Sequence, residues 1–251
     1  MDLGIAGKRA LVIGGSQGLG LAVSQRLAAE GVKLLVFARG RERLDACQQQ
    51  LRRTHGVEVD TCAGDITSQE DTDGLAAQAA ALRVQILVLN TPRPPSPMRD
   101  FLEENEQQRW DQAYQQQLHG ALLVLRKVPP AIVKTGWGRV VAITSATIKQ
   151  PLPRHAVSTI FRAGVQAALK HLAMEVAPHN VTVNSVAPAT IITPTFGTFH
   201  NVEQRIQAVP LKRAGKPEEL AATVAFLASE HAGFITGENI QLDGGQTRAL
   251  V

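Results

Sequence analysis

The chain has 251 residues, of which 44% are hydrophobic and 19% charged, and its formal net charge is +4. This apolar share excludes a disordered chain, no apolar run approaches the ~18 residues of a membrane helix, and the first residues are not typical of a signal peptide. The two cysteines, Cys47 and Cys62, do not indicate a disulfide framework or a metal site. The basic residues are not interleaved with aromatic residues, so they do not indicate nucleic-acid binding. We therefore expect a metal-free cytoplasmic protein.

Short apolar runs recur along the chain and are typical of strands that are covered on both faces. They span residues 10–13, 33–38, 57–63, 86–90, 139–144, 181–186 and 239–242. Amphipathic helical patterns separate them, over residues 18–30, 41–53, 68–82, 103–127, 156–177 and 217–229. Such alternation predicts right-handed βαβ units. We therefore predict one α/β domain over residues 1–251, a Rossmann-type doubly wound parallel sheet of about seven strands with helices on both faces.

Two segments do not fit a helix or a strand. Residues 91–97 contain four prolines and predict a stiff loop that leaves a strand end. Residues 189–201 follow the sixth strand and contain Phe196 and Phe199. Because loops at the carboxyl edge of a parallel sheet line ligand crevices, we predict a substrate lid around residues 189–210.

A glycine-rich turn, GGSQGLG at residues 14–20, follows the first predicted strand and opens a helix. A pyrophosphate binds to backbone N–H groups at the start of a helix, where no side chain stands in the way. Gly14, Gly18 and Gly20 meet that requirement. The position of the turn in the first βα unit favours a dinucleotide site over a purely structural turn.

The residue at the end of the second strand predicts which dinucleotide binds. An acidic residue about twenty positions after the glycine turn would bind the ribose of NAD. This chain has Arg39 there, and no carboxylate between Glu30 and Glu42. A guanidinium binds a phosphate by paired hydrogen bonds. We therefore predict that Arg39 binds a 2′-phosphate and that the cofactor is NADP(H).

Ordered matches along the whole chain resemble the short-chain dehydrogenase/reductase superfamily, most nearly its 3-oxoacyl-carrier-protein-reductase-like members. Beside the glycine turn they include Asp65-Ile66, Asn90, Ala163-Gly164-Val165, Asn184-Ser185-Val186 and Leu242-Asp243-Gly244-Gly245. The resemblance implies a small-molecule substrate and a homodimer or homotetramer, with residues 103–127 and 156–177 as interface helices.

The resemblance also implies the cofactor contacts, residue by residue. They are Gly14, Ser16, Gln17, Gly18, Leu19, Gly20, Arg39, Asp65, Ile66, Asn90, Arg162, Pro188, Ile191 and Thr193.

The catalytic positions depart from the family pattern. The family uses a tyrosine as the proton donor, helped by a lysine, a serine and an asparagine. Aligned on Ala163-Gly164-Val165, these four positions hold Ser158, Arg162, Ser145 and Gln117 in turn. The one tyrosine, Tyr114, is in another helix. A shorter gap would place His155 and Thr159 at the tyrosine and lysine positions, but it leaves the Ala-Gly-Val match out of register.

The substitutions change the chemistry that the site can perform. A serine hydroxyl is a far weaker acid than a phenol, whose pKa is near 10, and an arginine stays charged and cannot shuttle a proton. Arg162 can still stabilise an oxyanion, while Ser145 and Ser158 can orient a carbonyl. His155, one helical turn before Ser158, is either a candidate general acid or a plain residue at a helix start.

Three functions fit these residues. The first is an NADPH-dependent reductase of a small carbonyl or conjugated enone without the usual tyrosine acid, the enone taking its proton from water. The second is an NADP(H)-binding protein without redox activity, as a sensor or an assembly subunit. The third is non-redox chemistry of the halohydrin dehalogenase kind, but those enzymes give up the cofactor turn and keep the tyrosine. We favour the reductase, whose substrate the sequence does not name.

Overall fold

The computed structural model describes residues 1–194, 196 and 201–250. Over these residues, seven strands form one parallel sheet in the order β3-β2-β1-β4-β5-β6-β7. The strands are β1 (Arg9–Ile13), β2 (Lys33–Ala38), β3 (Val59–Ala63), β4 (Ile86–Asn90), β5 (Gly138–Ile143), β6 (Val181–Pro188) and β7 (Asn239–Leu242). The predicted doubly wound parallel sheet is confirmed.

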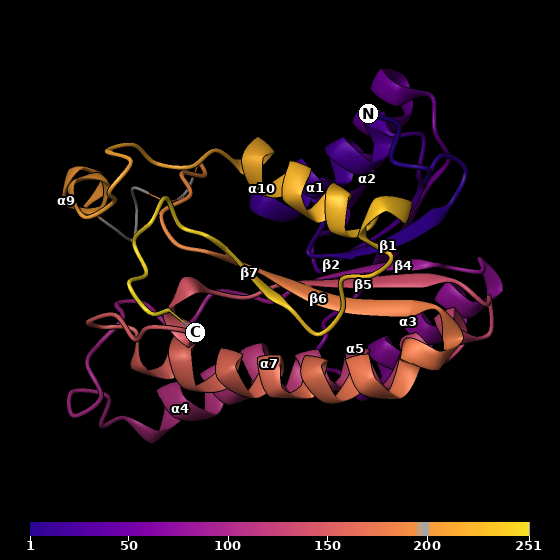
Figure 1. Cartoon of the computed structure of the whole chain (residues 1–251). Coiled ribbons are helices and arrows are strands. Elements are labelled where there is room, and N and C mark those ends of the chain that lie inside the picture. The colour runs from indigo at the N-terminus through magenta and orange to yellow at the C-terminus, as the bar shows by residue number, and fades with distance from the viewer. Residues whose placement is uncertain (195, 197–200, 251) are drawn as a thin grey trace.

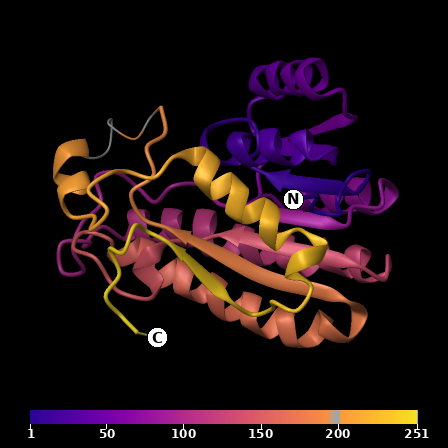
Figure 2. The same cartoon turned by 45° about the horizontal axis from the view of Figure 1, so that its top comes forward.

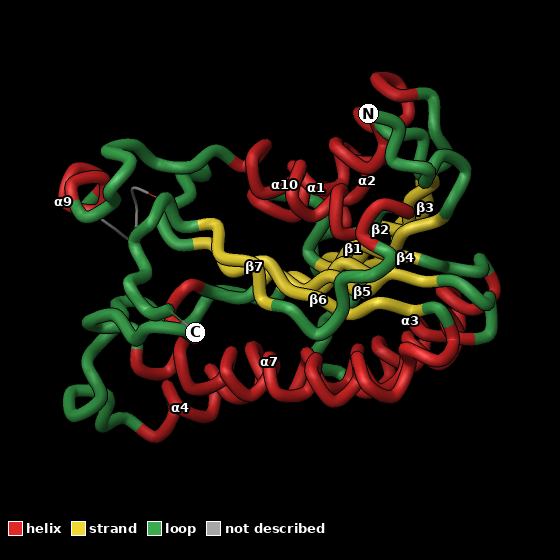
Figure 3. The backbone as a smooth tube through the Cα atoms, in the orientation of Figure 1, coloured by secondary structure: helices red, strands yellow, loops and turns green. Residues whose placement is uncertain are grey.

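Helices cover both faces of this sheet, as Figures 1 and 3 show. One face carries α1 (Gly18–Ala29), α2 (Arg41–His55) and α10 (Pro217–Leu227), and the other carries α3 (Gln69–Ala81), α5 (Gly120–Lys127) and α7 (Ala156–Val176). Successive strand residues point to opposite faces. Val12 therefore packs in the core under α1 and α10, while Leu11 packs in the core over α5 and α7. This two-sided burial explains why the strands are continuously apolar.

The single helix predicted over residues 103–127 was wrong at its start, because the helix begins only at Gln107, and in its middle. The chain forms α4 (Gln107–Ala113), then a π-helical segment η1 (Tyr114–His119), and then α5. A π-helical turn holds one residue more than an α-helical turn and is common at functional sites. One extra residue barely changes the polar pattern of a long helix, so the sequence does not reveal it.

Several shorter elements lie between these helices and strands. They are α6 (Pro129–Val133), α9 (Val202–Gln207) and the 3-10 turns η2 (Ala146–Ile148), η3 (Ala177–His179) and η4 (Glu230–Ala232). Among the described residues, none of the helices combines the length and the apolar character that a bilayer crossing requires.

The strand order reverses its direction between β1 and β4, and this reversal positions the site. In open parallel sheets, ligands bind beyond the carboxyl ends of the strands at such a point. Figures 1 and 2 both place α9 and the segment that precedes α4 at one end of the sheet. These two segments therefore flank the place where a ligand is expected.

Candidate active site

A cleft of about 990 Å³ opens at the carboxyl edge of the sheet. Its walls come from the turns after the first five strands, the start of α7, the segment after β6, and α9. Its volume is at the upper end of the range for small-molecule sites. Of the cofactor residues predicted from the sequence, all but Gly20 line it: Gly14, Ser16, Gln17, Gly18, Leu19, Arg39, Asp65, Ile66, Asn90, Arg162, Pro188, Ile191 and Thr193.

Gly20 lies beneath the cleft and lets the turn close. A Cβ atom on Gly20 would lie 2.1 Å from the carbonyl oxygen of Gly14, so only glycine fits. Gly18 has a φ of +54° and faces open space. In this described stretch, no side chain caps the start of α1 and its first turn holds no acidic residue. The turn thus has the open helix start that the diphosphate of a dinucleotide requires.

Two arginines stand at the end of the cleft next to β2 and β3. Nη1 of Arg39 lies 3.9 Å from Oδ2 of Asp65, and the Arg39 side chain is 64% exposed. Arg43, in the first turn of α2, lines the same end and donates from Nη1 to Oε1 of Gln17 at 2.6 Å. Sequence reasoning did not assign Arg43 to the site, although its place four residues after Arg39 was a usable signal. The pair fits a phosphate that projects from the adenosine end.

Ser145, Ser158 and Arg162 meet at the other end of the cleft. Oγ of Ser145 accepts hydrogen bonds from Oγ1 of Thr147 at 3.0 Å and from the backbone N–H of Thr147 at 3.3 Å. Oγ of Ser158 accepts from Nη1 of Arg162 at 2.9 Å, one turn apart along α7. Because protein donors reach both oxygens, each hydroxyl keeps its own proton to donate into the cleft.

The tyrosine and the lysines of the chain lie elsewhere. Among the described residues that line the cleft, none is a tyrosine or a lysine. Tyr114 is 41% exposed and packs against Phe161 and His119. Thr159 does not line the cleft, whereas Ser158 and Arg162 do. This placement favours the alignment with Ser158 and Arg162 over the one with the shorter gap.

His155 lines the cleft, but its surroundings argue against a general acid. Its Nδ1 lies 2.7 Å from the carbonyl oxygen of Pro153, and its Nε2 lies 3.1 Å from Nη2 of Arg205. A guanidinium only donates, so Nε2 accepts and the proton of the neutral ring is on Nδ1. Burial, and then the charges of Arg205, Arg162 and Arg154, lower the pKa of His155 below 6.5. These contacts and this lowered pKa argue against His155 as a proton donor, whose role stays a prediction.

Replacement of His155 tests whether it donates a proton. We expect His155→Ala to keep kcat within about 3-fold of the parent, since a general acid contributes ~100-fold or more. The pH–rate profile should lack an ionisation near the ordinary histidine pKa of about 6.5. His179→Ala, on the exposed turn η3, is the control for removing an imidazole. A large loss in His155→Ala alone would restore the general-acid role.

Gln117 is not part of the cleft lining. It is fully buried in η1, and neither its Oε1 nor its Nε2 has a hydrogen-bond partner among the described residues. Nε of Arg162 is also buried and lacks a partner in the same described set. Because η1 packs on α7, both orphaned groups lie in neighbouring elements. The structure thus brings four predicted catalytic residues together at the cleft and leaves the fifth, Gln117, behind it.

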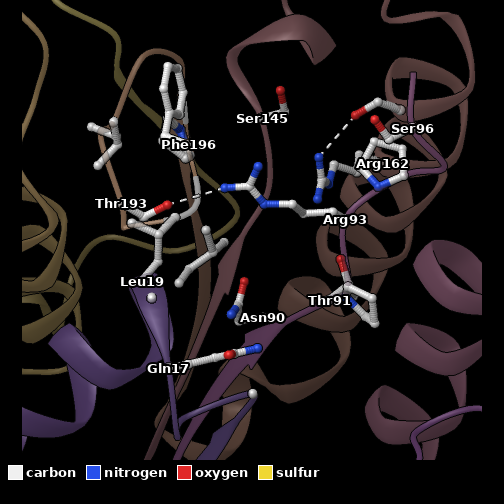
Figure 4. A pocket seen from close by; sticks show the side chains of 18 of the residues that line it. Gln17, Leu19, Asn90, Thr91, Arg93, Ser96, Ser145, Arg162, Thr193 and Phe196 are labelled. Atoms are coloured by element: carbon white, nitrogen blue, oxygen red, sulfur yellow. Dashed lines mark hydrogen bonds between the residues drawn. The ribbon is translucent and has the colours of Figure 1, made fainter. Parts of the chain in front are cut away.

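The remaining wall is formed by the segment after β4 and by the segment after β6. Figure 4 shows the side chain of Arg93 crossing the cleft toward Thr193, with Ser145 and Arg162 on the far side. Nη2 of Arg93 lies 3.3 Å from Oγ1 of Thr193. Phe196 lines the cleft and is buried. Phe199, the other predicted lid contact, lies outside the described residues.

Comparisons with known proteins agree with this geometry. Residues 14–247 match a family model described as enoyl-(acyl carrier protein) reductase. Dehydrogenase/reductase SDR family member 4 of Bos taurus is 30% identical over 247 residues, which cover 97% of this chain and 88% of that protein. The NADPH-dependent reductase BacG of Bacillus subtilis is 27% identical and is matched over 97% of this chain and 99% of its own length.

A solved structure shares the whole fold. L-Sorbose reductase from Gluconobacter frateurii, in complex with NADPH and L-sorbose, superposes with a TM-score of 0.92 over 100% of both chains, at 28% sequence identity. The family-model match begins at the glycine turn and extends beyond β7. It therefore includes nearly all of the residues that build the cleft.

Proposed function

Because the chain belongs to the short-chain dehydrogenase/reductase (SDR) family, we propose that it is an NADP-dependent oxidoreductase that reduces the C=C bond of a small conjugated enone. NADPH supplies a hydride when it is bound. The residues that would hold it are those of the glycine turn, Arg39 and Arg43, and Asp65 and Asn90. The open start of α1 and the two arginines at the end of β2 support this cofactor.

One observation carries the choice of an enone over a simple ketone. Among the described lining residues, the substrate end of the cleft holds no tyrosine and no carboxyl group, and the pKa of its histidine, His155, is lowered by burial. Ser158 stands in the place of an acid, and its partner is a guanidinium. Reduction of a ketone puts the hydride on carbon and leaves an alkoxide, which needs an acid at once. Reduction of a conjugated C=C bond leaves an enolate, which is less basic and can take its proton from water.

The chain then has to stabilise the enolate oxygen. When a hydride adds to the β-carbon, the C=C electron pair moves and negative charge develops on the carbonyl oxygen. The hydroxyls of Ser145 and Ser158 donate to that oxygen, and the charge of Arg162 stabilises it. The α-carbon then takes a proton from water, which leaves hydroxide, so the saturated ketone forms with one hydride and one proton added. These side chains orient the substrate and stabilise charge without ionising.

The cofactor preference gives a prediction for Arg39. We expect Arg39→Ala to raise the Kd of NADPH about 10- to 100-fold, the value of a lost charge-assisted pair, and to leave the Kd of NADH unchanged. Arg43→Ala should have a smaller effect, because Arg43 also binds Gln17. Calorimetric titration with both dinucleotides measures this. Equal effects of Arg39→Ala on NADPH and NADH would show that Arg39 does not bind the 2′-phosphate.

The reaction is tested with matched pairs of substrates. The purified protein is given NADPH with cyclic and open-chain enones and with the corresponding saturated ketones, and loss of NADPH absorbance is followed. We expect turnover of enones only. NADPH deuterated on the transferred position should place deuterium on the β-carbon, and reactions in heavy water should place it on the α-carbon. Reduction of the saturated ketones at similar rates would refute the enone proposal, and NADPH binding without any turnover would favour the cofactor-binding protein without redox activity.

Two further features are proposed for the whole molecule. We propose that residues 1–251 act as one domain in which residues 189–210 form the substrate lid. We also propose a homodimer or homotetramer through η1 and α7, where Tyr114 and Ile160 are 41% and 42% exposed. Light scattering on the eluted protein measures the mass. A monomer would refute the oligomer.

A further inference from the structure

The substrate end of the cleft is strongly cationic. Its described lining residues with basic side chains are Arg93, Arg154, His155, Arg162 and Arg205. The one carboxylate among the described lining residues is Asp65, which follows β3 and lies beside Arg39 at the adenosine end. A cleft for a neutral enone needs no such charge. The four arginines of this set carry the positive charge, since the His155 ring is neutral.

The backbone around Arg93 and the length of its side chain place its guanidinium across the cleft. It stands between Pro92 and Pro94, whose rings restrict the backbone after β4. Its side chain is solvent-exposed and extends toward the lid, where Nη2 lies 3.3 Å from the neutral hydroxyl of Thr193. Figure 4 shows the guanidinium between Thr193 and Ser145. A ligand that enters the cleft meets this group.

Arg162 faces the same space from α7, as Figure 4 also shows. Burial and, second, the charge of Arg93 lower the pKa of Arg162 to about 10, so its guanidinium remains charged at neutral pH. The two cations therefore lie close enough to repel each other. An anion between the two guanidinium groups is attracted by both of them, and this attraction offsets their mutual repulsion.

The phosphates of the cofactor do not account for these two residues. The features that fit the diphosphate and the 2′-phosphate belong to the β1–α1 and β2–α2 turns, with Arg39 and Arg43. Arg93 and Arg162 come from the segment after β4 and from α7, around the serines that face the reacting carbonyl. The second group of cations thus lines the substrate end of the cleft.

We propose that the substrate carries a carboxylate and that Arg93 binds it, while Arg162 faces the oxygen that becomes negative during reduction. This inference rests on the proposed function and names its substrate class, a small unsaturated oxo acid. A guanidinium fork matches a planar carboxylate with two parallel hydrogen bonds. Two cations then face two negative charges, one that the substrate brings and one that develops on the carbonyl oxygen. Arg154 and Arg205 at the rim attract the anion over a longer range.

The test compares an acid with its ester. Acetylacrylate is a conjugated oxo acid, and methyl acetylacrylate differs from it by the loss of the charge. We expect kcat/KM to be about 10- to 100-fold higher for the acid, the value of hydrogen bonds to a charged group. Arg93→Gln should remove this preference through KM, with kcat and the Kd of NADPH nearly unchanged, and Arg93→Lys should keep part of it. Arg53→Gln, an exposed charge at the end of α2, is the control and should change nothing.

Binding provides a second readout that needs no turnover. Levulinate, the saturated product, is titrated into the NADP⁺ complex by calorimetry, with methyl levulinate in parallel. We expect levulinate to bind at least about 10-fold more tightly than its ester, and Arg93→Gln to abolish the difference. If neither enone is reduced, the proposed function fails and this titration still decides the carboxylate site. Equal Kd values for levulinate and its ester, or a preference for levulinate that Arg93→Gln leaves intact, would overturn the inference. Reduction of both enones would in that case still support the proposed function.

Discussion

Replacing Arg162 with glutamine should lower kcat for a conjugated enone by about 100- to 1,000-fold, the usual loss when one donor to an oxyanion is removed. Nη1 of Arg162 donates a 2.9 Å hydrogen bond to Oγ of Ser158, so the substitution should weaken two of the three groups that we propose to face the carbonyl oxygen. Initial rates at saturating NADPH measure the effect. Since Nε of Arg162 is buried and lacks a partner among the described residues, the change should not cost stability.

Two further variants separate the charge of Arg162 from its shape. Arg162→Lys keeps a cation but loses the planar fork, so it should recover part of the lost kcat. Ser158→Ala removes the hydroxyl that Arg162 polarises. The losses of Arg162→Gln and Ser158→Ala should therefore be less than additive in the double variant, because the two side chains act as one unit. A kcat within about 3-fold of the parent in Arg162→Gln, far below the loss that removal of an oxyanion donor causes, would place the stabilisation of the oxyanion elsewhere.

The sequence predicted the parts of the molecule that depend on local pattern. Buried strands such as β2 and β4 are continuous apolar runs that a parallel sheet requires, and all seven were placed within one or two residues of their observed bounds. The glycine turn was found for a similar reason. Gly18 and Gly20 meet steric requirements that arise within the turn itself, between residues that are close together in the sequence. Chain order alone was enough for these features.

The parts that the sequence did not predict depend on contacts over long distances in the chain. The state of the His155 ring is set by Arg205, fifty residues later, whose guanidinium occupies Nε2. In the sequence, Arg93 is only a charged residue in a proline-rich loop. The structure shows that its side chain extends to Thr193, a hundred residues later in the chain. Gln117 was carried into the site from a position in a continuous helix, but η1 places it behind the cleft, fully buried. The reach of long side chains and the π-helical segment thus determine which of these residues face the cleft.

The substitution Gly20→Ala in the glycine-rich turn should lower both the stability of the protein and its affinity for NADPH. A Cβ at this position would lie 2.1 Å from the carbonyl oxygen of Gly14 and 2.7 Å from its carbonyl carbon, and backbone atoms cannot move aside as a flexible side chain can. The turn must therefore open, which should cost about 2–4 kcal/mol of unfolding free energy, in the range of strained core substitutions. The same opening moves the N–H groups at the start of α1, so the Kd of NADPH should rise at least ~100-fold.

The matched control is the same chemical change where nothing stands in the way. Gly74 lies on the exposed side of α3, and a Cβ there would meet no described atom within 4 Å. Because alanine is the better helix former, Gly74→Ala should raise the unfolding free energy by about 0.5–1 kcal/mol and leave NADPH binding unchanged. Urea unfolding and calorimetric titration measure both quantities on both variants. Opposite signs for the two glycines are the expected result, because one change forces two backbone segments apart and the other only restricts the unfolded chain. If Gly20→Ala unfolded at the same urea concentration as the parent and bound NADPH as tightly, the turn would not be the close backbone contact that holds the diphosphate.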